Sequence, residues 1–235
     1  RIQGQTQMYA MQLHLRESEL SALQSQINPH FLYNTLECMR SIGLYYQSPE
    51  IVTISTAMAD IFRYSIKERS LVTLEREIGI IKKYLSIIDI RFDNRFEADF
   101  DLTPETLNCV VPKMTLQPIV ENAFKHGISP KEEGGVVRIR VNPLREKGLL
   151  YISVCDNGVG IERARLEQLK NALAKPGERW EHIGVYNVAA RLRLLDERSH
   201  LKICSHPGRG TAIRLYLPLI EPEEEDLDDD PIVDC

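Results

Sequence analysis

The sequence predicts an α+β protein, in which an N-terminal helical hairpin dimerises to a four-helix bundle and an α/β sandwich with a mixed, mainly antiparallel sheet follows. Three observations predict this fold class. Apolar residues recur at helical spacing up to about residue 70, a short loop at Ser48-Pro49 divides that stretch, and helical and alternating segments interleave from residue 71 onward. We therefore divide the chain into a helical region, 1–70, a mixed region, 71–220, and a tail, 221–235.

The helical region combines a heptad pattern with two predicted helices. Leucine and isoleucine recur every seven residues within 13–27, which is typical of helices that pair. Pro29 predicts a kink in this pattern, because proline lacks a backbone N–H and disfavours helix at the preceding residue. Helical spacing continues to residue 47 and again over 51–65. Since one hairpin cannot bury both of its apolar faces, we expect a homodimer.

The mixed region opens on a long amphipathic helix. Thr73 is its predicted N-cap, and the apolar positions over 74–92 are three and four residues apart. A second helix is predicted over 115–126. Alternation predicts strands around 137–141, 150–154 and 211–217, and helical spacing predicts helices around 166–173 and 185–195.

Composition and charge exclude several classes of protein. With 43% hydrophobic and 27% charged residues in 235, the chain is an ordinary globular protein, not a collagen-like or fully disordered one. Five scattered cysteines without a CxxC pair argue against a disulfide framework or zinc site and favour a reducing compartment. Residues 221–235 hold nine acids and no base, which predicts a solvated, disordered tail. The rest has no concentrated basic stripe, so nucleic acid is not an expected partner.

A glycine-rich loop follows the strand that ends at Cys155. Its sequence is Asp156-Asn157-Gly158-Val159-Gly160, and two glycines so close together let the backbone approach a ligand. A carboxylate can accept a hydrogen bond from the N6 amino group of adenine, so Asp156 suits an adenine site. Arg163 replaces the third glycine of a dinucleotide-binding loop, and no P-loop sequence occurs. For this motif alone, a plain strand-to-helix turn is the alternative.

The segment 117–127 carries polar residues on one helical face. Asn122, Lys125 and His126 stand at i, i+3 and i+4. An amide oxygen suits Mg²⁺, and an ammonium group suits phosphate oxygens. For this segment alone, a polar helix surface is the alternative.

Two further glycine motifs precede later elements. His182-Ile183-Gly184 opens a predicted helix, and Gly208-Arg209-Gly210-Thr211 opens the last predicted strand. Free N–H groups at a helix N-terminus can bind phosphate, although a glycine before an element most often marks only a turn.

The order and spacing of these four motifs resemble the ATP-binding domain shared by histidine kinases, gyrase and Hsp90, over about residues 71–220. The resemblance implies ATP and Mg²⁺ as cofactors, with Asn122 holding Mg²⁺ and Asp156 binding adenine. It also makes residues 162–183 a mobile lid. The other ATP-site residues that it implies are Lys125 and His126 near phosphate or ribose, then Gly158, Gly160, Gly184, Asn187 and Thr211, the last supporting the adenine-binding carboxylate.

A fifth motif, Pro29-His30-Phe31-Leu32-Tyr33-Asn34, resembles the phosphoacceptor box of sensor histidine kinases of the LytS/YesM type. With the other motifs, this likeness spans nearly the whole chain and implies that His30 is the phosphoacceptor. Neutral imidazole is a nucleophile near pH 7, and Asn34, at i+4, can hydrogen-bond the ring. In isolation, His30 would be a surface helix residue.

Three positions depart from the resemblance. Phe31 follows the phosphoacceptor, where most histidine kinases have an acidic residue, and His182 stands at the usual first glycine of the third motif. Pro118 occupies the position of the general-base glutamate in gyrase-like and Hsp90-like hydrolases, and Glu121 points about 100° away from Asn122 on a helix. The missing base favours transfer to a built-in nucleophile over hydrolysis.

The predicted function is the cytoplasmic kinase core of a sensor histidine kinase. ATP would phosphorylate His30, and the phosphoryl group would pass to an aspartate of a response regulator. Because the chain begins at Arg1 with neither Met nor a signal-peptide pattern, we predict that it is a fragment of a longer protein. The resemblance to sensor histidine kinases implies that the full-length protein is anchored in the bacterial inner membrane by an upstream segment. The alternatives are an ATP-hydrolysing clamp of the same fold and a non-catalytic signalling scaffold.

Overall fold

The computed structural model describes residues 29–93, 95–174 and 183–221. The chain divides into two compact units, 1–59 and 60–235. Three predictions concern residues outside the described ranges. They are the heptad segment, the kink at Pro29, which depends on the backbone before it, and the acidic tail after Glu221. The functional regions proposed from the sequence, with a boundary at residue 70, stay a prediction.

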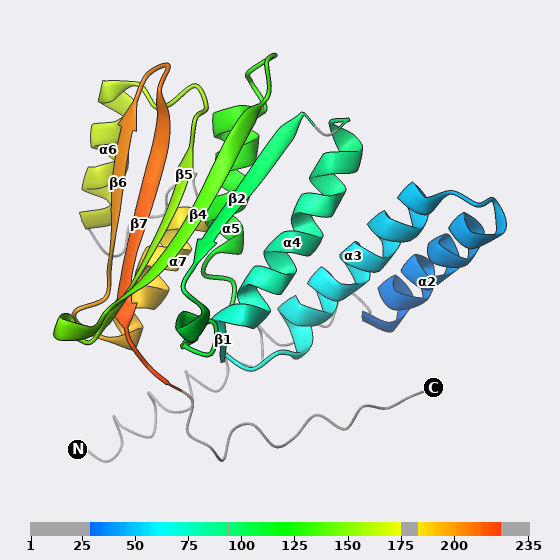
Figure 1. The fold of residues 1–235 in the computed structure, drawn as a ribbon, viewed down its shortest axis with the longest axis horizontal. Helices are drawn as coiled ribbons and strands as arrows, with labels where there is room; N and C mark the ends of the chain where they lie inside the picture. Colours follow the sequence, from blue (N-terminus) through cyan, green and yellow to red (C-terminus); the bar gives the residue numbers. More distant parts are fainter. Residues whose placement is uncertain (1–28, 94, 175–182, 222–235) are drawn as a thin grey trace, which may run out of the picture. The chain divides into compact units, whose positions relative to one another are not determined.

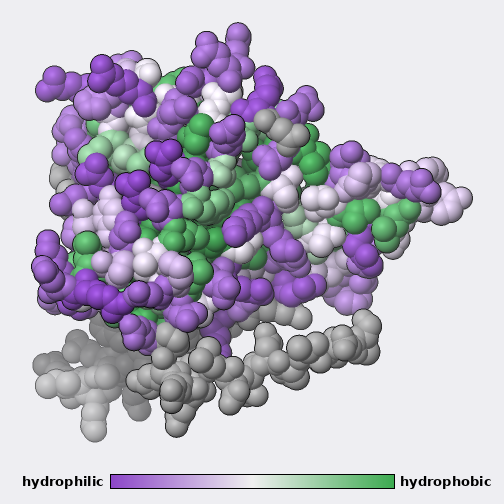
Figure 2. Space-filling model, in the orientation of Figure 1, coloured by the Kyte–Doolittle hydropathy of each residue, from purple (hydrophilic) through white to green (hydrophobic). Residues whose placement is uncertain are grey.

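The first unit contains a helical hairpin (Figure 1). Helix α2 (Pro29–Tyr45) is followed by α3 (Pro49–Lys67), whose residues 60–67 belong to the second unit. The two helices approach closely at Gly43, where an added Cβ would lie 3.0 Å from Cγ2 of Ile51 and of Val52. The hairpin expected from the helical spacing is therefore confirmed. Apolar side chains remain exposed on it (Figure 2), among them Met39, Ile42, Leu44, Tyr45, Ile51 and Met58.

A five-stranded sheet built from the described residues forms the centre of the second unit. Its order is β2 (Phe96–Leu102), β4 (Gly135–Leu144), β5 (Leu149–Asp156), β7 (Gly210–Pro218) and β6 (His200–His206). Strands β2 and β4 are parallel, and the other three pairs are antiparallel. Two short strands, β1 (Leu71–Thr73) and β3 (Val110–Pro112), form a separate antiparallel pair. The predicted mixed, mainly antiparallel sheet is confirmed.

The helices of the second unit match the predicted positions. Thr73 caps α4 (Leu74–Arg91), since its hydroxyl accepts a hydrogen bond from the N–H of Arg76 at 3.3 Å. Helix α5 (Gln117–Asn122) continues as a π-helix (Ala123–Ile128), and α6 (Arg163–Ala174) and α7 (Ile183–Leu195) follow. Short 3₁₀ turns lie at Pro104–Thr106 and Arg145–Lys147.

Burial alternates along the sheet and defines two layers. In β4, Val137, Ile139 and Val141 are fully buried, whereas Arg138 and Arg140 between them are exposed. The buried face packs with α4, α5 and α7 into one core. The second unit is therefore an α/β sandwich, as the sequence predicts.

Four strands of the structure, β1, β2, β3 and β6, are not among those predicted from the sequence. Residues 96–102 and 200–206 alternate apolar and polar side chains, so that β2 and β6 carry a usable signal. The other two, β1 and β3, have three residues each, too few for a period-two pattern to stand out.

Candidate active site

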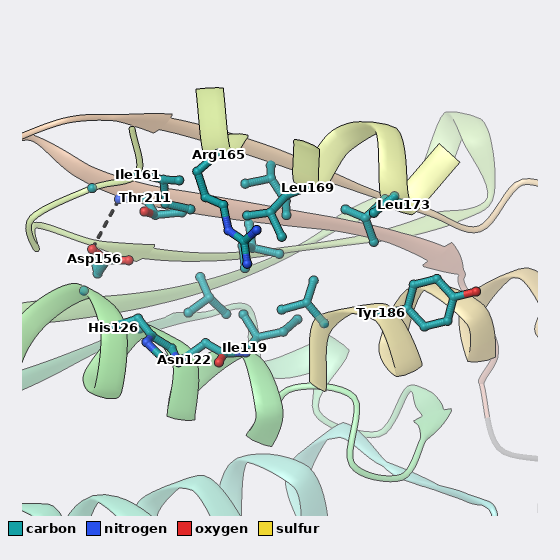
Figure 3. Close-up of a pocket in the computed structure, with 18 of the residues that line it drawn as sticks. Ile119, Asn122, His126, Asp156, Ile161, Arg165, Leu169, Leu173, Tyr186 and Thr211 are labelled. Carbon is teal, nitrogen blue, oxygen red and sulfur yellow. Dashed lines mark hydrogen bonds between the residues drawn. The ribbon is translucent and has the colours of Figure 1, made fainter. Parts of the chain in front are cut away.

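A cavity of about 590 Å³ lies in the second unit, between α6 and the helical segment that carries Asn122. Figure 3 shows Arg165, Leu169 and Leu173 of α6 on one side, and Asn122 and His126 on the other. Its volume is within the range of small-molecule sites. Most of the remaining wall is apolar and includes Ile119, Ala123, Val154, Ile161, Ala172, Val185, Ile203 and Ile213.

Asp156 lies at the end of β5 and, with Glu162, is one of the two acidic residues that line the cavity. Its Oδ1 accepts hydrogen bonds from the N–H of Gly158 at 2.9 Å and of Thr211 at 3.2 Å, the second of which is drawn in Figure 3. Burial raises the pKa of this carboxyl above its ordinary value, and both hydrogen bonds oppose that shift. Because both backbone N–H groups donate to Oδ1, Oδ2 can accept a hydrogen bond from a ligand, for example from the amino group of adenine.

Thr211 supports Asp156 as the resemblance implied, but through its backbone N–H. Its hydroxyl lies 2.9 Å from Oγ of Ser205, which also donates to the carbonyl of Gly210. Thus β7 and β6 together hold the donor that orients the carboxylate.

Glycine is required where the loop after Asp156 meets the π-helix. The N–H of Val159 donates to the carbonyl of Gly127 at 2.9 Å, and a Cβ on Gly158 would overlap that same carbonyl. A Cβ on Gly127 would in turn lie 2.7 Å from Oδ1 of Asp156. Gly160 has φ +71°, a left-handed conformation that favours glycine. Gly127 ends the 117–127 segment but is not among the site residues that the sequence predicts.

Replacing Gly158 by alanine is expected to lower the free energy of unfolding by about 1–3 kcal/mol and to abolish nucleotide binding, because the backbone contact with Gly127 must open. The matched control is Gly79→Ala in α4, where an added Cβ meets nothing within 4 Å and stability should rise by about 0.5–1 kcal/mol. Thermal unfolding and titration with a fluorescent ADP analogue measure both effects. Equal changes in stability and nucleotide affinity in the two variants would contradict the inference that only glycine fits at position 158.

The structure separates the polar residues of the 117–127 segment. Asn122 and His126 line the cavity, whereas Lys125 is exposed and lies outside the lining. The helix widens to a π-helix from Ala123, so a residue three positions on no longer shares the face of Asn122 as it would in an α-helix.

The remaining predicted residues lie near the cavity or away from it. Gly160 lines it, and Gly184 lies beside it, since an added Cβ would be 3.4 Å from Nδ2 of Asn122. Asn187 of α7 is exposed and does not line the cavity. Within the predicted lid, residues 163–174 form α6, whereas residues 175–182, including His182, lie outside the described part of the chain.

Arg165 is a cavity residue that the sequence analysis does not identify. It stands on α6 and points toward Asn122 across the cavity (Figure 3). Its guanidinium is the kind of group that binds phosphate oxygens. One signal was available, since Arg165 is a basic residue inside the predicted lid.

His30 lies in the first unit, one residue after the start of α2, and is exposed. The side-chain amide nitrogen of Asn34 lies 3.3 Å from Nδ1 and 3.5 Å from Nε2 of the ring. The expected i,i+4 contact between these side chains is therefore present, and it leaves the ring at the surface of the helix.

Two family models match this chain. One, described as histidine kinase, matches residues 18–96, and the other, described as histidine kinase-, DNA gyrase B-, and HSP90-like ATPase, matches residues 112–221. This chain belongs to the histidine kinase family. Residues 112–221 of this histidine kinase are an ATP-binding domain, and the family resemblance seen in the sequence is confirmed.

Curated relatives of this histidine kinase are sensor proteins. The sensor histidine kinase YesM of Bacillus subtilis (strain 168) is 35% identical over 209 residues, which are 88% of this chain and 34% of YesM. The sensor protein LytS of Bacillus anthracis is 31% identical over 216 residues, 91% of this chain and 36% of LytS. The chain thus spans about a third of the length of the curated relatives it matches.

Among solved structures, the histidine kinase domain of the blue-light activated histidine kinase of Erythrobacter litoralis EL346 matches with a TM-score of 0.46 and 17% sequence identity. The match covers 82% of this chain and 86% of that domain.

In the part of this histidine kinase that the structure describes, no helix has the length and apolar character needed to span a bilayer.

The structure of this histidine kinase also places the two residues relevant to hydrolysis. Glu121 accepts a hydrogen bond from Nε2 of Gln117 at 2.8 Å and is not part of the cavity lining. Pro118, one helical turn before Asn122, carries no group that could accept a proton from water. Neither residue is placed to activate a water molecule in the cavity.

Proposed function

We propose that this chain is the kinase core of a sensor histidine kinase that uses ATP to phosphorylate His30 and then passes the phosphoryl group to an aspartate of a response regulator. The observation that carries the proposal is that one chain holds both a phosphoacceptor motif with His30 exposed and a cavity built around Asp156. Membership of the histidine kinase family supports it.

The residues of the cavity suit Mg·ATP. Asp156 would accept the adenine amino group on Oδ2, and the apolar wall would pack against the base. Asn122, His126 and Arg165 would meet the phosphates. The described residues contain no cluster of three or more acidic, histidine or cysteine side chains, so Mg²⁺ would be held by Asn122 together with phosphate oxygens and water. When bound, the ion would neutralise charge on the phosphates.

In the transfer step, a lone pair of the His30 ring attacks the γ-phosphorus of ATP. The N–P bond forms as the bond to the β,γ-bridging oxygen breaks, ADP leaves, and the ring loses its remaining N–H proton to solvent. Asn34 acts as an orienting residue, because an amide has both a donor and an acceptor and can hold the ring. A carboxylate oxygen of the regulator then attacks the same phosphorus, and the N–P bond breaks.

The alternative of an ATP-hydrolysing clamp is disfavoured by Pro118 and by the position of Glu121 outside the cavity. We further propose that the chain acts as a homodimer, because apolar side chains such as Met39, Ile42 and Met58 are exposed on the hairpin. Placement in the cytoplasm, with an anchor in the inner membrane elsewhere in the full-length protein, belongs to the same proposal.

Incubation with γ-³²P-ATP and Mg²⁺ tests the proposed function. We expect label on the protein that is lost in acid and retained in alkali, as phosphohistidine requires. Release of inorganic phosphate without labelled protein would instead favour the hydrolase, and absence of ATP binding in calorimetry would favour the scaffold. Either result would overturn the proposal.

Replacing Asn122 by alanine is expected to remove most of the gain in nucleotide affinity that Mg²⁺ provides, on the order of tenfold, because the amide oxygen is the proposed protein ligand of the ion. Titrations of a fluorescent ADP analogue with Mg²⁺ and with EDTA measure this gain. Asn108→Ala, an exposed position outside the cavity lining, is the control. Unchanged titration curves for Asn122→Ala would refute the assigned role.

A further inference from the structure

One buried carboxylate in the second unit collects four hydrogen-bond donors. Glu77 of α4 is 1% exposed and accepts hydrogen bonds from the hydroxyl of Tyr64 and from the backbone N–H groups of Met114, Thr115 (3.1 Å) and Leu116 (2.9 Å). Burial raises the pKa of Glu77, and these hydrogen bonds oppose the shift. Burying a carboxylate is unfavourable unless its oxygens are hydrogen-bonded, and here the four donors meet that requirement.

Three of the donors belong to residues 113–116, which we call the α5 entry loop because it joins β3 to α5. Leu116 is the N-cap residue of α5 and provides no side-chain cap. Glu77 therefore supplies the acceptors that a capping side chain would otherwise provide. Met114 has φ +57°, a left-handed conformation that is unfavourable for a residue other than glycine and must be held by its surroundings.

The entry loop is also tied to the end of α3. Tyr64 lies in residues 60–67 of α3, and its hydroxyl oxygen lies 3.3 Å from the backbone nitrogen of Met114. The ammonium group of Lys113 donates to the carbonyls of Ser65 at 3.3 Å and Glu68 at 2.9 Å, where α3 ends. The loop thus contacts the last turn of α3 through two separate side chains.

From the entry loop, α5 leads directly into the cavity wall. Ile119 and Asn122 line the cavity. Asn122 stands six positions after Leu116, about 9 Å at the rise of an α-helix. Fewer than two helical turns join the loop to the Asn122 amide, so a shift of the loop is expected to displace that amide.

We propose that Glu77 is a positioning residue for the kinase reaction: it fixes the α5 entry loop against Tyr64, so that a change at the end of α3 moves Asn122 and alters how Mg²⁺ and nucleotide are held. This inference rests on the proposed function, in which Asn122 is the ligand of Mg²⁺. It assigns to residues 60–67 of α3, which belong to the second unit, a physical connection to the ATP site.

The test compares Glu77→Gln and Tyr64→Phe with Glu75→Gln, an exposed glutamate on the same helix. The readout is the ratio of the dissociation constants of a fluorescent ADP analogue in EDTA and in Mg²⁺. We expect this ratio to fall about tenfold in Glu77→Gln, less in Tyr64→Phe and not at all in the control, with affinity in EDTA nearly unchanged. Hydrogen exchange of the amides of Thr115 and Leu116 should become faster in Glu77→Gln.

A purely structural role predicts a different pattern, namely a lower melting temperature with affinity reduced equally in EDTA and in Mg²⁺. That result, or an unchanged ratio in folded Glu77→Gln, would overturn the proposal. If Glu77→Gln does not fold, the ratio measured in Tyr64→Phe tests the proposal. This variant keeps the Glu77 carboxylate with its three backbone donors. The assay measures nucleotide binding and does not use phosphoryl transfer. If His30 is not labelled by ATP but the ratio of dissociation constants still falls in Glu77→Gln, the proposed function is rejected and the role of Glu77 is not.

Discussion

Replacing His30 by glutamine is expected to reduce labelling from γ-³²P-ATP to background while the affinity for nucleotide stays that of the unaltered chain. Glutamine is helix-compatible and similar in length, but its amide nitrogen has no lone pair available for attack on phosphorus. The cavity is built from residues of the second unit, and none of its lining residues comes from the hairpin's first helix. Autoradiography and an ADP-analogue titration measure the two properties separately.

The matched control is His200→Gln. His200 is an exposed histidine of β6 whose ring stacks on Tyr216, and it lies outside the cavity lining. Its replacement should leave labelling unchanged. Label that persists in His30→Gln, or a phosphopeptide that maps to another side chain, would refute the assignment of the phosphoacceptor.

Replacing Asp156 by asparagine is expected to weaken ATP binding on the order of 100-fold. One carboxylate must accept two backbone N–H groups and the adenine amino group at once, and an amide replaces one acceptor oxygen with a donor. Calorimetry with ATP measures the loss, and labelling of His30 should fall with it. Asp101→Asn, on the exposed face of β2, is the control, and equal losses in the two variants would contradict a specific role.

The raised pKa of Asp156 gives this prediction a pH dependence. The carboxylate must be ionised to accept all three donors, so nucleotide affinity should fall as pH is lowered through that pKa, at a higher pH than for an exposed aspartate. In Asp156→Asn the affinity should be flat over the same range. For the ligand-free protein the sign is opposite, because the folded state holds this proton more tightly: the contribution to stability is present at low pH and lost as pH rises through the raised pKa.

Local patterns predicted the elements whose side chains face one buried layer. Helix α4 and its cap Thr73 were found because amphipathic spacing extends over eighteen residues, and the strands β4, β5 and β7 because five to seven of their residues alternate apolar and polar side chains. The pair β1–β3 could not be found this way, since strands of three residues form only when tertiary structure brings the two segments together.

Some residues of the candidate site could likewise be predicted from the sequence, and others could not. Asp156, Asn122 and Gly160 come from separate motifs and line one cavity, whereas their predicted roles toward ATP and Mg²⁺ stay predictions. Lys125 does not, because the face shared by residues three apart depends on the helix being an α-helix, and the π-helix here changes that face.

By itself, the sequence determined the family, the helices of the second unit and three of its longer strands, since these depend on residue types and spacings within short segments. Which residues hold nucleotide in the cavity stays a prediction. Only the tertiary structure decided that Arg165 of α6 points across the cavity and that Glu77 receives the N–H groups of Thr115 and Leu116. The physical reason is distance along the chain. Hydrogen bonds between residues almost forty positions apart leave no periodic trace in either segment, and they form only once the helices pack on the sheet.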